Sequence, residues 1–84
     1  MNTQPPLKNT LDVEIGERVS EALIIKRVPA KSLASDLGIS YSSIRRTLAA
    51  ERAFTFWQLA QIAERLNIQP SSLLPDTFAA REVA

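Results

Sequence analysis

The sequence contains no cysteine and no histidine among its 84 residues. Disulfide bonds and zinc sites made of Cys and His ligands are therefore excluded. The same absence excludes a serine or cysteine nucleophile that is activated by histidine. Glycine is scarce, with two residues, and no segment alternates β-branched with polar residues. These absences argue against an enzyme and favour an all-α domain without metal or cofactor.

Long apolar runs are absent as well. No run approaches the roughly 20 residues that a membrane-spanning helix needs. The segment from Met1 to Lys8 is polar and lacks the apolar core of a signal peptide. We therefore expect no contact with a membrane and a cytoplasmic location.

Positive charge is concentrated in the middle of the chain, although the formal net charge is only +1. Residues 26–52 hold six basic and two acidic side chains, a net charge of +4. Residues 1–25 carry −2, from two basic and four acidic side chains, and residues 53–84 carry −1, from two and three. A basic middle segment is where a phosphate backbone would be expected to bind.

Apolar residues recur at three- and four-residue intervals and predict five helices around one core. The helices are expected at 10–27, 30–37, 41–50, 56–66 and 71–74. Residues 1–9 are interpreted as a flexible N-terminal arm, 10–75 as the folded domain and 76–84 as a tail or short extra helix. Phe56 is expected in the core. Trp57 falls beside the apolar stripe and is expected to pack against the core or against a tail carrying Phe78 and Val83, rather than against a second copy of the chain.

The most informative segment is 30–49, which predicts two short helices joined by a tight turn. Gly38 can adopt a positive φ without steric cost, as a sharp turn requires. Ser40 is a favourable N-cap for the second helix. Ala34 is small enough to let the two helices approach. Four apolar residues are expected to fill the space beneath the turn: Leu33, Leu37, Ile39 and Ile44.

This segment, LASDLGISYSSIRRTL, resembles the helix-turn-helix of the lambda-repressor-like family, which includes the Cro and repressor proteins. The similarity continues into TFWQLAQIAERLNIQPSSLL, which is similar to the fourth and fifth helices of that family. Two positions depart from the family pattern: Ala30 stands where glutamine is frequent, and Thr47 where an aliphatic residue is usual. The resemblance implies a compact five-helix DNA-binding domain whose recognition helix, 41–50, enters the major groove.

The resemblance also implies which side chains contact double-stranded DNA. We expect Ile44 and Leu48 to point inward, which leaves the polar side of the helix free. Candidate base contacts are Tyr41, Ser42, Ser43, Arg45 and Arg46, because arginine can bind guanine with two hydrogen bonds. Candidate phosphate contacts are Lys31, Ser32, Arg52 and Thr55.

The expected function is therefore that of a sequence-specific transcriptional regulator, of the phage or prophage repressor type, that occupies operator DNA. Two alternatives remain open at this point. One is the antitoxin of a toxin–antitoxin pair with the same fold, and the other is a helical protein-interaction module. A homodimer also stays open. The carboxylates at Asp12, Glu14, Glu17 and Glu21 are interpreted as favourable charges in the N-terminal half of the first helix, and no small-molecule substrate is expected.

Overall fold

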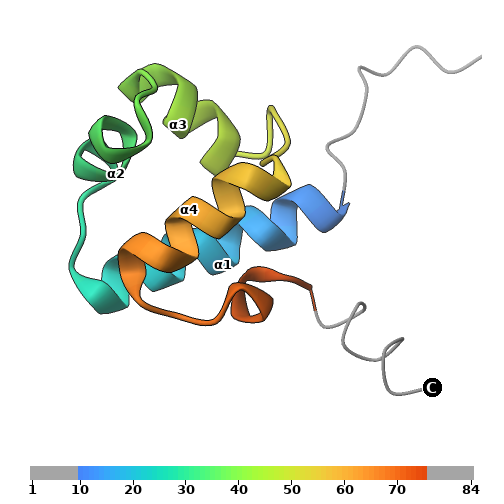
Figure 1. Ribbon diagram of the computed structural model, residues 1–84. Helices are drawn as coiled ribbons and strands as arrows, with labels where there is room; N and C mark the ends of the chain where they lie inside the picture. The colour runs from blue at the N-terminus through green and yellow to red at the C-terminus, as the bar shows by residue number, and fades with distance from the viewer. Residues whose placement is uncertain (1–9, 76–84) are drawn as a thin grey trace, which may run out of the picture.

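The computed structural model describes residues 10–75, which form four α-helices and one 3₁₀ helix with no strand in that range (Figure 1). The helices are α1 (Thr10–Lys26), α2 (Ala30–Leu37), α3 (Tyr41–Leu48), α4 (Phe56–Leu66) and the 3₁₀ helix η1 (Pro70–Leu73). The expected arm, 1–9, and tail, 76–84 with Phe78 and Val83, lie outside the described residues. The all-α prediction is confirmed for the described part of the chain.

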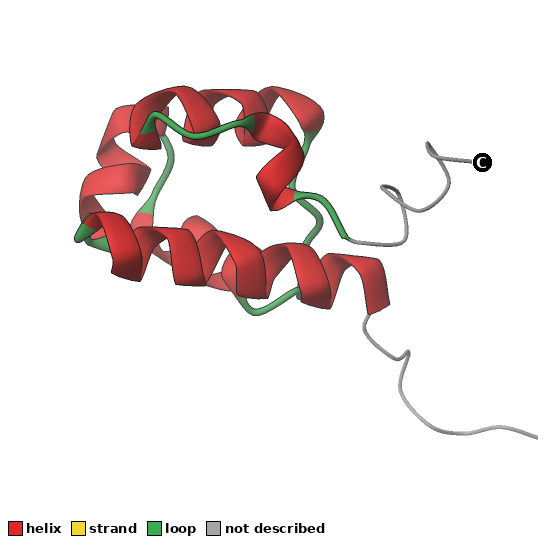
Figure 2. Ribbon diagram, turned by 90° about the horizontal axis from the view of Figure 1, so that it is seen from below, coloured by secondary structure: helices red, strands yellow, loops and turns green. Residues whose placement is uncertain are grey.

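The long helices α1 and α4 pack against each other, and α4 crosses in front of α1 in Figure 1. Helices α2 and α3 lie on one side of this pair, and η1 packs on the other side (Figure 1). Figure 2 shows the same helices from the side of η1, joined by short loops. Within residues 10–75, no helix is long and apolar enough to span a bilayer.

One cluster of buried apolar side chains joins all five elements. Helix α1 contributes two residues to it, α2 three and α4 four, whereas α3 and η1 contribute one each. Of the four residues expected beneath the turn, Leu33, Leu37 and Ile44 belong to this cluster and Ile39 packs against it. The cluster consists of Val19, Leu23, Leu33, Ala34, Leu37, Ile44, Leu59, Ile62, Ala63, Leu66 and Leu73.

Phe56 is an exception, because its side chain is 85% exposed. It is the first residue of α4, directly after the N-cap Thr55, where the helix has not yet turned its apolar side inward. Phe54, two residues earlier in the connecting loop, packs against the core instead. The prediction of a buried Phe56 was therefore wrong.

The segment expected as a fifth α-helix forms a single 3₁₀ turn. The amide of Ser72 donates to the carbonyl of Gln69 at 3.0 Å, and the amide of Leu74 donates to Ser71 at 3.2 Å. Both bonds have the three-residue spacing of a 3₁₀ helix. Pro75 disfavours a helical backbone at the residue before it, and Leu74 is extended there, so the turn ends after Leu73.

All four α-helices end in the same way. A residue with a left-handed backbone follows each helix, directly after α1, α2 and α4 and one residue later, beyond Ala49, after α3. The amide after it donates to the carbonyl five residues back at 2.9–3.0 Å. This is the Schellman motif, which satisfies carbonyl groups that the helix end leaves unpaired. The left-handed residues are Arg27, Gly38, Ala50 and Asn67.

Candidate nucleic-acid interface

The turn between α2 and α3 has the geometry expected from the sequence. Gly38 has φ 72° and ψ 27°, and its amide donates to Ser35 at 3.1 Å. The amide of Ile39 donates to the carbonyl of Ala34 at 3.0 Å. Ala34 is buried where α2 meets its neighbours. Three residues thus separate two helices of eight residues each, which pack against each other.

Ser40 caps the N-terminus of α3, as predicted. Its hydroxyl accepts a hydrogen bond from the amide of Ser43 at 3.1 Å, and it donates to the hydroxyl of Ser43 at 3.0 Å. The hydroxyls of Ser40 and Ser42 are 3.2 Å apart. These bonds satisfy an amide that would otherwise lack a partner, and they commit the Ser43 side chain to the cap.

The buried side of α3 differs from the expected one. Ile44 is fully buried, as predicted, but the second buried residue is Thr47, at 2% exposure, while Leu48 is half-buried. The hydroxyl of Thr47 is satisfied because it donates to the carbonyl of Ser43 at 2.9 Å. Helix α3 also ends at Leu48, so the expected range of 41–50 is two residues too long.

Most of the candidate contact residues lie on the surface. Of the expected base contacts, four are exposed and Ser43 is half-buried within the cap. The four expected phosphate contacts are all exposed, although Thr55 is engaged in a capping box with Gln58 through two hydrogen bonds of 3.0 Å. The exposed candidates are Tyr41, Ser42, Arg45 and Arg46 on α3, with Lys31 and Ser32 on α2 and Arg52 and Thr55 in the following loop.

The structure adds a contact that sequence reasoning missed. The Nζ atom of Lys31 lies 5.5 Å from the centre of the Tyr41 ring, and the Cζ atom of Arg45 lies 5.8 Å from it. Both distances fall within the range of a cation–π interaction. The four-residue spacing of Tyr41 and Arg45 was the available signal, whereas the approach of Lys31 depends on how α2 and α3 cross.

Acidic side chains interfere little with this basic surface. Asp36, on α2, forms an ion pair with Arg65 of α4. Both side chains are more than 40% exposed, so the pair adds little stability, but it partly neutralises the single acidic residue of α2. Glu51 is the other carboxylate in the basic segment 26–52.

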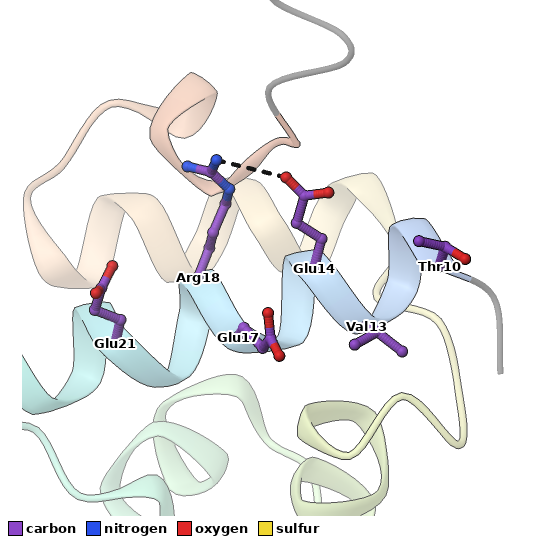
Figure 3. Close-up of a pocket in the computed structure, with 6 residues that line it drawn as sticks. All are labelled: Thr10, Val13, Glu14, Glu17, Arg18 and Glu21. Atoms are coloured by element: carbon purple, nitrogen blue, oxygen red, sulfur yellow. Dashed lines mark ion pairs between the residues drawn. The ribbon is translucent and has the colours of Figure 1, made fainter.

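The carboxylates of α1 gather on another surface, around a shallow hollow lined by Glu14, Glu17 and Glu21 (Figure 3). Arg18 extends toward Glu14 there, and the two side chains form an ion pair at 3.5 Å. This surface would repel phosphate. Within residues 10–75, no group of three or more acidic side chains is arranged to hold a metal ion.

A comparison with protein-family models gives a match that covers almost the whole chain. None of the curated proteins matches significantly. The model of the BetR domain matches residues 8–82, which include all five elements and the basic surface of α2 and α3. The chain therefore belongs to the BetR domain family, a family of small helical domains of the helix-turn-helix type.

Proposed function

We propose that this protein is a sequence-specific DNA-binding transcriptional regulator of the repressor type. Helices α2 and α3 act as a helix-turn-helix, and α3 enters the major groove of operator DNA as the recognition helix. Bound over a promoter, the domain would block RNA polymerase. The single observation that carries the proposal is that Arg45 and Arg46 are both exposed on a short helix that follows a glycine turn.

The surroundings of α3 support the same function. Lys31, Ser32 and Arg52 are exposed near its two ends and could bind phosphates on either side of the groove. Membership of the BetR domain family supports a regulatory role for a domain of this size. The similarity to the lambda-repressor-like family, noted from the sequence, supports the assignment of α3 to the groove.

The test is a double variant, Arg45→Ala with Arg46→Ala, measured against DNA selected by the wild-type protein from a random pool. Each arginine that binds a guanine contributes roughly 1–3 kcal/mol to base discrimination. We therefore expect the affinity for the selected sequence to fall at least tenfold, with an unchanged circular dichroism spectrum. Lys26→Ala is the matched control, because Lys26 lies beside η1 and not beside α3. Normal affinity in the double variant would refute the proposal.

A protein-interaction module is the second candidate, and exposed apolar residues favour it. Ile24 and Ile25 on α1 are 76% and 69% exposed, and Trp57 on α4 is 60% exposed. Such residues often mark a protein contact, either with a second copy of the chain or with a different protein such as a toxin. If the selected DNA is palindromic, the spacing of its half-sites reports a homodimer. Failure to select any DNA would favour the interaction module.

A further inference from the structure

Tyr41 occupies a special place among the candidate contact residues, because it lies at the junction of both short helices. It is the first residue of α3, and its ring is approached by Lys31 from α2 and by Arg45 from the next turn of α3. In helices, long side chains lean toward the N-terminus of their helix. The guanidinium of Arg45 is thereby directed back over Tyr41, toward the end of α3 from which a recognition helix contacts bases.

Arg46 lacks such a partner within residues 10–75, where the structure shows no ion pair or ring contact for its side chain. The two neighbouring arginines therefore differ before any ligand binds. The side chain of Arg45 is already restricted by the Tyr41 ring, whereas that of Arg46 has to be ordered on binding. Ordering a long side chain opposes association, so a side chain that is already restricted binds at a lower entropic cost.

We propose that Tyr41 is a positioning residue, whose ring holds Arg45 and Lys31 in one cationic cluster across α2 and α3. This inference rests on the proposed DNA-binding function and assigns different roles within it. Arg45 is the oriented base-reading arginine, Lys31 is held beside it for a phosphate, and Tyr41 acts through both of them. The expectation that Tyr41 itself contacts a base stays a prediction beside this role.

The first test uses DNA affinity for the selected sequence. Tyr41→Leu removes the ring, and we expect the affinity to fall roughly two- to fivefold, the range of a cation–π contact at an exposed site. Tyr41→Phe keeps the ring without the hydroxyl and should rescue that loss. In a double-mutant cycle, Tyr41→Leu should have a smaller effect once Arg45→Ala is present, because only its effect through Lys31 then remains. If Tyr41→Phe loses as much affinity as Tyr41→Leu, or if the losses from Tyr41→Leu and Arg45→Ala simply multiply, the proposal is overturned.

The second test uses the free protein and separates this inference from the proposed function. A ring beneath Arg45 and Lys31 shifts the NMR signals of their side-chain protons upfield. We expect these shifts in the wild type and in Tyr41→Phe, and we expect them to disappear in Tyr41→Leu. Their absence in the wild type would overturn the cluster even if DNA binds. Their presence in a protein that binds no DNA would support the cluster and refute only the DNA-binding function.

Discussion

At the residue scale, the absence of a side chain at Gly16 determines how closely α1 packs against α3. A Cβ atom on Gly16 would lie 2.6 Å from the carbonyl oxygen of Leu48, at the end of α3. Gly16 therefore lets α1 pack against the backbone of α3 without a side chain between them. The proposed recognition helix takes its position from this contact, although the sequence alone gives no sign that a glycine within a helix has this role.

We predict that Gly16→Ala destabilises the protein. Alanine is better than glycine within a helix by about 1 kcal/mol, but overpacking of a closed site costs about 1–3 kcal/mol. The free energy of unfolding, measured by urea denaturation, should fall by about 1 kcal/mol. Glu17→Ala, an exposed neighbour on the same helix, serves as the control and should change it by less than about 0.5 kcal/mol. A more stable Gly16→Ala variant would show that the contact with α3 is looser than described.

Thr47 is the second residue whose environment differs from expectation. Its buried hydroxyl donates a hydrogen bond to the backbone carbonyl of Ser43, in the same helix. Hydrogen bonds of this kind add little to helix stability. We predict that Thr47→Val leaves the free energy of unfolding unchanged or raises it by up to about 1 kcal/mol, because a methyl group replaces a polar atom in an apolar site. Thermal denaturation measures this effect. A loss of more than about 1 kcal/mol would mean that the hydroxyl stabilises α3.

The exposed residues of α3 were predictable, but the details of its buried side were not. Arg45 and Arg46 are exposed as expected, since Ile44 fixes which side of a short helix is buried. The burial of Thr47 in place of Leu48 depends on the angle at which α1 crosses α3. That angle depends in turn on Gly16, on another helix. The order of polar and apolar residues within α3 therefore does not indicate whether Thr47 or Leu48 is buried.

At the element scale, the shared Schellman endings explain which helix ends could be predicted from the sequence and which could not. Ser40 was predicted as an N-cap, because few residue types suit that position. Gly38 was predicted to turn the chain between the two short helices, because glycine adopts a positive φ without steric cost. Arg27 and Ala50 adopt the same left-handed backbone, with φ 58° and 64°, but their residue types give no such signal. The expected third helix was too long for this reason.

These endings predict effects of opposite sign for two substitutions. Gly38→Ala should lower the free energy of unfolding by about 1 kcal/mol, because a Cβ there meets no atom within 4 Å and only the left-handed backbone opposes it. Arg27→Gly should raise it by a few tenths to about 1 kcal/mol, because glycine adopts that backbone without strain. Chemical denaturation of both variants gives the comparison. Two shifts of the same sign would contradict the argument.

At the scale of the whole molecule, two surfaces differ in the sign of their charge. Glu14, Glu17 and Glu21 line a hollow on α1, whereas Lys31, Arg45, Arg46 and Arg52 are exposed on α2, α3 and the loop that follows. The charge distribution along the sequence predicted the basic surface. It could not show that Asp36 is paired with Arg65, because these residues are 29 positions apart.

The proposed DNA contact predicts a measurable dependence on salt. Each phosphate that the protein neutralises steepens the fall of log affinity with log salt concentration by roughly 0.9. Arg52→Ala should therefore make the slope shallower by about 0.9 per protomer, while the preferred DNA sequence stays the same. Lys26→Ala should leave the slope unchanged. Fluorescence anisotropy measures the affinity at each salt concentration. If the slope of log affinity against log salt concentration is the same for Arg52→Ala and the wild type, Arg52 does not contact a phosphate.

The domain has an uneven charge distribution, because Glu14, Glu17 and Glu21 gather around one hollow while Lys31, Arg45 and Arg46 are exposed on α2 and α3. A polyanion attracts one side of such a molecule and repels the other over about one Debye length, roughly 10 Å at 0.1 M salt. A protein molecule that approaches the DNA duplex would therefore turn its α3 side toward the duplex before contact. Fewer collisions with the duplex would be unproductive. The association rate constant would therefore rise at low salt concentration, without any additional contact in the final complex.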